Sequence, residues 1–323
     1  MEKLIVSSSP HFHTKTTTQS IMRDVLIALS PAAIASVVLF GFKSLLVLAV
    51  CIATCVLSEF IFNLVVKKKQ TVSDLSACVT GTLLALSLPA SVGVWHCIVG
   101  SVLAIIVVKC LFGGLGCNFA NPAVTARVFL LTAFASSIGG GTGTVFTSGG
   151  ADLTASATPL EIIKPGSEST ATLPTLIDML IGNRGGAIGE TCAIALIIGG
   201  IYLIVRKVIN WQVPAIYIGT VFLLSLVIRL DFNLALYEVL GGGVIIAAFF
   251  MATDYATTPI DKRGRMIFAL GCALLTILIR HLGAYPEGVS FAILLMNIVS
   301  PYIEKLSAKK PFGKKEVKKN EKQ

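Results

Sequence analysis

Ten apolar runs, each about as long as a bilayer is thick, constrain the fold of this chain. A transmembrane helix needs about 20 consecutive apolar residues, and a helix satisfies its own backbone hydrogen bonds in lipid. Of the 323 residues, 54% are hydrophobic and only 13% are charged, whereas roughly a quarter are charged in soluble domains. The sequence therefore predicts an all-α polytopic membrane protein with about ten transmembrane helices. The runs cover residues 24–41, 45–66, 72–88, 94–112, 123–138, 187–205, 212–228, 235–252, 266–282 and 287–304.

The distribution of basic residues predicts how these helices are oriented. If the N-terminus is cytoplasmic and all ten runs cross, 19 Lys and Arg residues fall on the cytoplasmic side and five on the other. The remaining two, Lys109 and Arg127, flank a cytoplasmic loop. Lys and Arg are normally in excess in cytoplasmic loops, so both termini are predicted to be cytoplasmic. The net charge of +9 is then explained by the basic residues of the cytoplasmic loops and tail. Because these residues do not form a nucleic-acid-binding face, no nucleic-acid partner is predicted.

The longest polar segment divides the runs into two groups of five and falls on the extracytoplasmic side. Equivalent helices are five apart, an odd number, so the two halves are predicted to be inverted repeats, as in many transporters. Weak similarity between Val79–Pro89 and Leu240–Phe250 supports this prediction. The basic tail is expected to lie near anionic lipid or a partner subunit. The predicted parts are a cytoplasmic segment (1–22), a first repeat (23–138), an extracytoplasmic loop (139–186), a second repeat (187–304) and a basic cytoplasmic tail (305–323).

Two polar stretches next to predicted helices are candidates for a binding site inside the membrane. The loop Gly113–Ala123 carries Asn118 and Asn121, whose amides both donate and accept hydrogen bonds. The end of the eighth run is dense in hydroxyls and carries Thr253 and Asp254. For the first stretch, a tight turn between helices is as good an interpretation as a polar site for a ring or an ion.

No set of metal ligands is predicted. Cys51 and Cys55 share a helix face, but no His or carboxylate completes a set, and the four histidines are scattered. Charged side chains within membrane spans are costly and usually have a function. Here most of them are interpreted as interfacial anchors or as partners of neighbouring helices, namely Glu59, Asp74, Arg127 and Glu190.

The extracytoplasmic loop contains one stretch, Thr147–Glu161, that is rich in hydroxyls and glycines. By composition alone, this stretch is a disordered surface loop. Its second half nevertheless resembles the flavinylation sequence of the family that comprises the D subunit of the Rnf complex and the B subunit of the Na⁺-pumping NADH:quinone reductase. In that family, a flavin transferase joins FMN through a phosphoester to the last threonine of an Asp-x-x-Ser/Thr-Gly-Ala-Thr pattern. The resemblance implies that Thr158 is the acceptor, and that Asp152, Ser156 and Ala157 belong to the motif.

Two positions depart from the family pattern. Ala155 stands where Ser or Thr is expected, and Ser156 stands where Gly is expected. Both replacements are small, so the loop is still expected to enter a transferase. The chain also lacks the longer N-terminal extension expected of the quinone-reductase subunit, so the Rnf branch is the closer resemblance. Further segments that resemble family motifs are Ser9–His11, Val79–Gly81, Gly113–Gly116 with Asn121–Pro122, Met251–Asp254 and Gly283–Gly288.

The resemblance implies a function and a set of partners. The chain is expected to be an electron-carrier subunit of an ion-pumping ferredoxin:NAD⁺ oxidoreductase in the bacterial cytoplasmic membrane, without a complete active site of its own. Its expected partners are the A, B, C, E and G subunits of the Rnf complex, a flavin transferase, and Na⁺ or H⁺. A second, non-covalent flavin (riboflavin) is expected within the membrane, because transfer across about 30 Å needs an intermediate station. Asn118, Asn121, Thr253 and Asp254 are the candidates to hold it or to line an ion path.

Two alternatives stay open at this point. An inverted repeat alone is equally compatible with a secondary transporter or channel that carries no flavin, because a fold does not determine a function. A structural subunit that has lost its flavin is the third interpretation.

Overall fold

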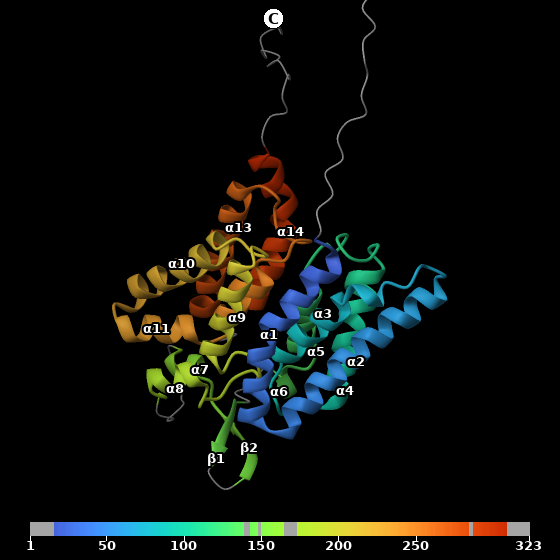
Figure 1. Ribbon diagram of the computed structural model, residues 1–323. Helices are drawn as coiled ribbons and strands as arrows, with labels where there is room; N and C mark the ends of the chain where they lie inside the picture. The colour runs from blue at the N-terminus through green and yellow to red at the C-terminus, as the bar shows by residue number, and fades with distance from the viewer. Residues whose placement is uncertain (1–15, 139–142, 148–149, 165–172, 284–286, 309–323) are drawn as a thin grey trace, which may run out of the picture.

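The computed structural model describes residues 16–138, 143–147, 150–164, 173–283 and 287–308. Helices form the first half of this described chain (Figure 1). Several of them are short, because turns and irregular segments interrupt the predicted runs. They are α1 (Thr18–Phe40), α2 (Phe42–Val65), the 3-10 turn η1 (Val72–Asp74), α3 (Ser76–Leu86), α4 (Val94–Val102) with its π-helical continuation η2 (Leu103–Cys110), α5 (Pro122–Ala133) and α6 (Ala135–Ile138).

A small unit that contains a β-hairpin and a second group of helices follow. The unit consists of the antiparallel hairpin β1 (Gly143–Thr147) and β2 (Gly150–Ser156), with the short helices α7 (Pro159–Ile163) and α8 (Leu176–Ile181). The second group contains a helix that is broken at three glycines. It comprises α9 (Ala193–Val205), α10 (Gln212–Arg229), α11 (Phe232–Leu240), α12 (Val244–Ile246) with its π-helical continuation η3 (Ala247–Met251), α13 (Lys262–Leu282) and α14 (Val289–Ser307).

The prediction of a helical, polytopic membrane protein is confirmed, and the hairpin adds two strands outside the membrane helices. Among the described residues, five helices are long and apolar enough to cross a bilayer, namely α1, α2, α10, α13 and α14. The broken pair formed by α11 and the segment 244–251 counts as a sixth span, and its two parts meet at 60°. Apolar helices of 10–17 residues cover the other runs.

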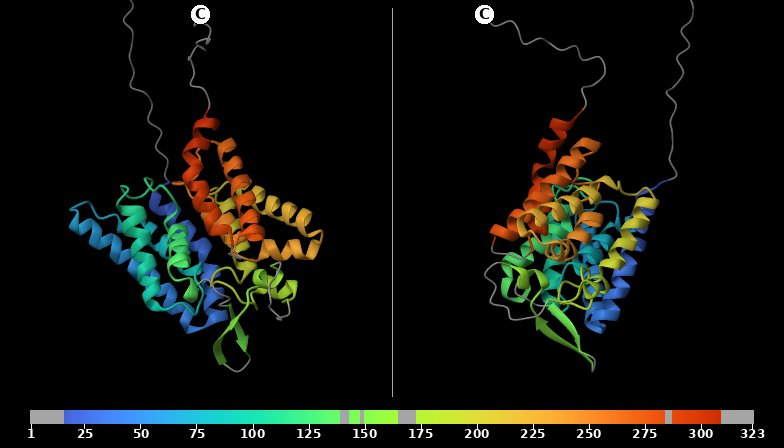
Figure 2. Two further views of the ribbon diagram at one scale, coloured as in Figure 1. Left: turned by 180° about the vertical axis from the view of Figure 1, so that it is seen from behind. Right: turned by 90° about the vertical axis from the view of Figure 1, so that its left-hand side faces the viewer.

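The two groups of helices lie side by side (Figures 1 and 2). Helix α1 packs against α9, and α5 packs against α14, so the two groups contact each other along these two helix pairs. Helix α1 begins and α14 ends at one end of the molecule, whereas the hairpin, α7 and α8 lie at the opposite end (Figures 1 and 2). The loop that carries the candidate acceptor is therefore remote from the described ends of the chain.

Two helix starts differ from the sequence prediction by six residues, the first for a local reason and the second because of a tertiary contact. Helix α1 begins at Thr18, six residues early, because the side chain of Thr17 caps it and Ser20 completes the capping box. Helix α9 begins at Ala193, six residues late. The preceding backbone instead folds against the end of α3, where the N–H groups of Ile188 and Gly189 donate to Leu88 and Leu86 at 2.9 and 2.7 Å.

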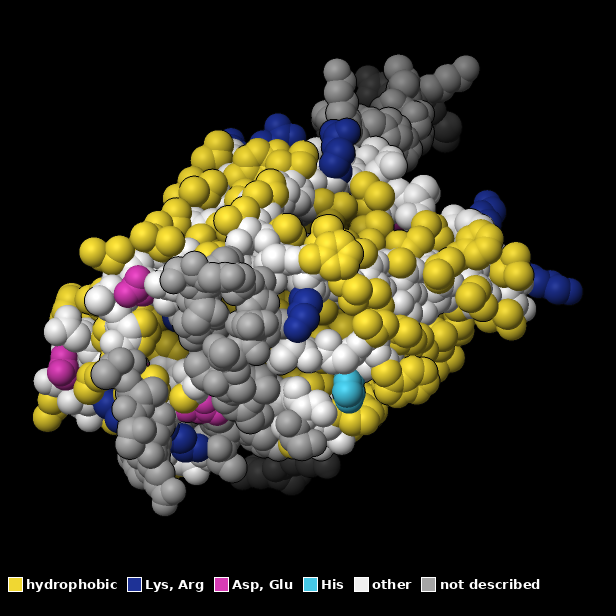
Figure 3. Space-filling view, turned by 90° about the horizontal axis from the view of Figure 1, so that it is seen from below, with side chains coloured by type: hydrophobic (Ala, Val, Ile, Leu, Met, Phe, Trp, Pro, Cys, Tyr) yellow, Lys and Arg dark blue, Asp and Glu magenta, His cyan; other side chains and the backbone are white. Residues whose placement is uncertain are grey.

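The outer surface of the helices is apolar. Phe42, Val65, Val205 and Val227 are all more than 70% exposed, and hydrophobic side chains cover much of the rim of the face that carries the hairpin (Figure 3). Contiguous apolar surface of this extent is not stable in water. Lipid or partner helices are the environment that such a surface requires.

Candidate functional site

The hydroxyl of Thr158 is held at the start of a helix. Thr158 has an extended backbone, and its Oγ1 accepts a hydrogen bond from the N–H of Glu161 at 3.3 Å. The Glu161 carboxylate in turn accepts from the N–H of Thr158 at 2.9 Å. These reciprocal bonds form a capping box, and Pro159 occupies the first helical position, where its missing N–H costs nothing. The half-buried Thr158 therefore sits in an ordered turn, although composition alone indicated a disordered loop.

The other residues of the motif precede this turn on the hairpin. Asp152 and Ser156 lie in β2, where Ser156 pairs with Gly143 of β1. Ala157 is half-buried and connects the strand to Thr158. The motif thus begins in the hairpin and ends at Thr158, the N-cap of α7. A strand at this place was not predicted, because the segment is short and rich in glycine and small residues.

Helix α7 rests on the break between α11 and α12. Its Leu160 is buried and lies so close to the break that a Cβ on Gly242 would overlap with the Leu160 Cδ1. Gly242 also has φ +61°, a conformation that favours glycine. Lys164, at the end of α7, donates to the carbonyl of Gly283 at 3.0 Å. Thr158 is therefore anchored over a break between two apolar helices.

Two buried arginines satisfy the backbone at this break. Arg280 of α13 donates to the carbonyls of Glu238, Gly241 and Gly242 at 2.5, 3.1 and 3.3 Å. Arg184 donates to the carbonyl of Leu240 at 2.7 Å. Carbonyls freed at a helix end must find donors when water is absent. Both arginines thus stabilise the interrupted helix.

A further charged group lies beside the last glycine of the break. Arg127 of α5 is buried and forms an ion pair with Glu287, which precedes α14. Glu190 is also buried, and its Oε1 accepts from the N–H of Ala187 at 3.0 Å. Arg127 was expected to be an anchor or a partner of a neighbouring helix, and the structure gives it a partner 160 residues along the chain. Nothing in the local sequence identifies that partner.

The second set of predicted site residues lines one cavity on the side of the molecule away from the hairpin. Asn118, Asn121, Thr253 and Asp254 all contribute to it, together with the apolar side chains of Val25, Val79, Leu83, Phe249 and Phe250, and its volume is about 760 Å³ including the open mouth. The two stretches that carry these four residues lie more than 130 residues apart in the sequence.

Hydrogen bonds fix three of these four side chains. The Asn121 Oδ1 caps α5 by accepting from the N–H groups of Ala123 and Val124, and its Nδ2 donates to Asp254 at 3.4 Å. The Thr253 hydroxyl donates to the carbonyl of Phe249 at 2.6 Å. Within the described part of the chain, the buried Oδ1 of Asn118 has no hydrogen-bond partner.

The lining of the cavity suits a ligand that is apolar with polar edges. Its walls combine apolar side chains with a few amide, hydroxyl and carboxyl groups, which is the usual composition of a cofactor site. The unpartnered Asn118 Oδ1 is an acceptor for a ligand N–H group. Burial raises the pKa of the Asp254 carboxyl above its ordinary value. No group of three or more His, Cys, Asp or Glu residues suited to a metal ion is found in the described ranges.

The chain is similar to known proteins over nearly its whole length. Residues 5–313 match the sequence model of the NQR2, RnfD, RnfE family. The chain is 44% identical to the D subunit of the Na⁺-translocating ferredoxin:NAD⁺ oxidoreductase complex of Acetobacterium woodii, with 99% of this chain and 98% of that protein covered. It is 40% identical to the D subunit of the proton-translocating ferredoxin:NAD⁺ oxidoreductase complex of Clostridium ljungdahlii, with 95% and 96% covered.

A more distant relative extends the comparison. The D subunit of the ion-translocating oxidoreductase complex of Halorhodospira halophila is 34% identical, with 95% of each chain covered. The similarity spans the hairpin, the helix break and the cavity alike. The chain belongs to the NQR2, RnfD, RnfE family.

Proposed function

We propose that this chain is the membrane electron-carrier subunit of an ion-pumping ferredoxin:NAD⁺ oxidoreductase, and that it carries FMN attached through a phosphoester to Thr158. The observation that supports this most strongly is the position of the Thr158 hydroxyl. It ends the motif at a capped, half-buried turn that is anchored over a helix break. A threonine ester oxygen still accepts the capping hydrogen bond, so attachment leaves the turn intact. The flavin, when bound, supplies the redox chemistry, and the protein orients it.

The proposed topology has ten crossings in two inverted five-helix repeats, with both termini cytoplasmic and the hairpin outside. Three observations support it. Helices α1 and α9, and likewise α5 and α14, pack in pairs between the halves. The third helix of each half is interrupted, at Leu75 in the first half and at Gly241–Gly243 in the second, and both breaks contain left-handed residues. The hairpin lies opposite the ends of α1 and α14 (Figure 1).

The cavity is proposed to hold a second, non-covalent flavin of the riboflavin type. Asn118 would accept from a ring N–H, and the apolar walls would cover the ring faces. With such a ring in the cavity, electrons would cross from Thr158 to the cytoplasmic surface in two shorter transfers instead of one long one. An ion path through the same four polar residues is the competing assignment.

The proposed partners follow from the relatives. Electrons would come from ferredoxin through other subunits of the complex (A, B, C, E and G), pass through Thr158-bound FMN and return toward the cytoplasmic NAD⁺-reducing subunit. A flavin transferase would mature the chain. One relative is named for Na⁺ translocation and another for proton translocation, so the proposal includes either ion. On its own, the subunit has no complete active site.

Covalent flavin fluorescence after denaturing electrophoresis tests this proposal. The chain is co-expressed with a flavin transferase as wild type, Thr158→Ala, Thr158→Ser and Thr154→Ala. We expect fluorescent bands for wild type and Thr154→Ala, no fluorescence for Thr158→Ala, and fluorescence for Thr158→Ser if the transferase accepts serine. Thr154 lies in the same hairpin and is the matched control. A dark wild-type band would favour a transporter or a structural subunit, which co-purification with the complex then separates.

A further inference from the structure

A buried ion pair forms part of the cavity wall in the first half. Lys109, on η2, and Glu59, on α2, are each no more than 2% exposed, and their Nζ and Oε2 atoms lie 2.8 Å apart. The Lys109 Nζ also donates to the Ser76 hydroxyl at 2.7 Å. Lys109 and Ser76 both line the cavity with Asn118 and Asp254. Charged groups at such a depth are retained mainly for function.

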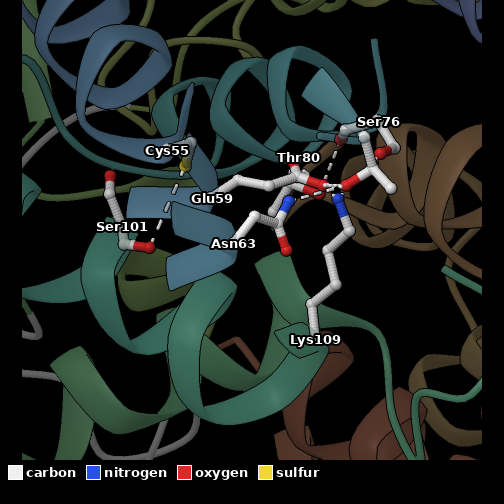
Figure 4. A network of polar contacts seen from close by, with 8 residues as sticks. Cys55, Glu59, Asn63, Ser76, Thr80, Ser101 and Lys109 are labelled. Carbon is white, nitrogen blue, oxygen red and sulfur yellow. Dashed lines mark hydrogen bonds and ion pairs between the residues drawn. The ribbon is translucent and has the colours of Figure 1, made fainter. Parts of the chain in front are cut away.

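The pair continues as a hydrogen-bonded chain toward the surface (Figure 4). The second carboxylate oxygen of Glu59 accepts from the Thr71 hydroxyl at 2.6 Å. Thr71 is exposed, and its oxygen also accepts from the amide of Asn63 at 3.0 Å. Every member of the chain except the amide can give or take a proton. Two hydrogen bonds, Lys109–Glu59 and Glu59–Thr71, therefore join the wall of the cavity to an exposed loop.

Asp254 lines the same cavity as Lys109, on the segment that follows η3. The other titratable groups near the ion pair are the thiols of Cys55, Cys78 and Cys110, one from each of the three elements that surround the pair, and Lys68 lies near Cys110. Lys109 lies in a π-helical stretch, and π-helical turns are frequent at functional sites. Asp254 is therefore the one competing carboxyl group among the described residues that line the cavity.

We propose that Lys109, Glu59 and Thr71 form a proton relay between the loop at Thr71 and a redox ligand in the cavity. The proposal rests on the proposed function, in which the cavity holds a flavin and the Thr71 loop faces the cytoplasm. When two electrons arrive on the ligand, the Lys109 ammonium gives one proton to a basic atom of the ligand. A proton from water at Thr71 reaches Lys109 through Glu59. On reoxidation the same proton returns to the loop, so charge and protons balance.

Four variants separate a relay from a merely structural ion pair. Lys109→Arg keeps the positive charge but cannot release a proton in a protein. Thr71→Val removes the hydroxyl that donates to Glu59 but keeps both charged side chains, and Thr71→Ser restores it. Ser73→Ala is the matched control, because Ser73 is an exposed hydroxyl two residues away. The buried arginine variant can fail to fold, so Thr71→Val keeps the test decisive.

The experiment measures proton uptake on reduction. The full-length chain in lipid nanodiscs is mixed rapidly with reduced methyl viologen, which gives up electrons without releasing protons, in weak buffer. A pH dye follows the protons taken up with the reduction of its non-covalent flavin. We expect Lys109→Arg and Thr71→Val to slow uptake at least about 100-fold, as loss of a positioned acid or base does. Thr71→Ser and Ser73→Ala should match wild type. Uptake at the wild-type rate in both Lys109→Arg and Thr71→Val would overturn the relay.

The flavin content of the same samples distinguishes this outcome from failure of the proposed function. Acid extraction of the wild-type chain should release one flavin that is not covalently bound. If no flavin is released, the second flavin site is wrong and the relay has no ligand to serve. If flavin is present and uptake is unchanged, the site stands and only the relay is wrong.

Discussion

The two halves of the molecule each bury a basic residue of the fourth helix near the break in the third, but they use it differently. In the first half, Lys109 donates to a carboxylate and a hydroxyl and lines the cavity. In the second half, Arg280 donates to three backbone carbonyls at the glycine break. Lysine can exchange a proton, whereas arginine is a permanent cation with several fixed donors. One half therefore places its cation in the wall of a cavity, and the other uses its cation to hold the backbone under Thr158.

The largest loss of stability is expected when either buried cation, Arg280 or Lys109, is replaced by a neutral side chain. Arg280→Met leaves three carbonyls unpaired, and Lys109→Met leaves the Glu59 carboxylate buried alone, so each should cost about 3–5 kcal/mol of stability. The double variant Glu59→Leu/Lys109→Met should return to within about 2 kcal/mol of wild type, because a neutral pair needs no counter-charge. Thermal unfolding in detergent measures all three. If neutralising Glu238 restored the stability of Arg280→Met as fully as Glu59→Leu restores that of Lys109→Met, Arg280 would act as a counter-charge. Its proposed role as a donor to the backbone carbonyls would then be refuted.

A smaller loss of stability is expected when Gly242, in the helix break, is replaced by alanine. Gly242→Ala places a Cβ in the left-handed conformation, at a cost of about 1–2 kcal/mol, and pushes it against Leu160. Helix α7 should be displaced, and the fraction of chain that carries covalent flavin should fall. Gly219→Ala on α10 is the control, since a Cβ there meets nothing within 4 Å. If the two variants carry the same fraction of covalent flavin, the packing of α7 on the helix break is not required for flavin attachment.

The capping box should contribute less again. Glu161→Ala removes the bond to the Thr158 N–H and should loosen the first turn of α7 by about 1 kcal/mol, whereas Glu161→Gln should retain most of it. Amide hydrogen exchange at the N–H of Thr158 reports the loss directly. No change in exchange for Glu161→Ala would mean that packing of Leu160 alone orders the turn.

The smallest effect on stability is expected from Asp254, in the cavity between the two halves. The pKa of Asp254 is raised by burial, so its protonated form is favoured in the folded state. Stability from this group is fully present below the ordinary Asp pKa and is lost as the pH rises through the raised value. Asp254→Asn should therefore remove this pH dependence and be the more stable chain at neutral pH. Unfolding curves at several pH values test it, and parallel curves for the two chains would contradict it.

Much of the membrane fold could be predicted because it depends on local signals. The length of an apolar run is enough to place a helix, and every predicted run contains one. The capping box at Thr158 and Glu161 is also a local signal, because a hydroxyl followed three residues later by Glu marks a helix start. Helix starts went wrong where tertiary contacts decide them, as at Ile188 and Gly189, whose N–H groups bond to the end of α3.

The partners of the buried charges could not be predicted. Glu59 and Lys109 lie 50 residues apart, and Arg127 and Glu287 lie 160 apart. Such pairs are set by packing between helices, which periodicity does not describe. The sequence indicated Asn121 and Asp254 together as candidates for the second site, but it did not predict that they contact each other. The structure places them 3.4 Å apart in one cavity, and their role toward a flavin stays a prediction.

The mass of the proteolytic peptide that contains Thr158 tests the central claim most directly. The peptide is taken from the chain purified with its complex after co-expression with a flavin transferase, and fragmentation locates the modified residue. We predict a mass increased by that of FMN less one water, with the modification on Thr158 and on no other residue of the hairpin. An unmodified Thr158 in a complex that is assembled and active would contradict the account.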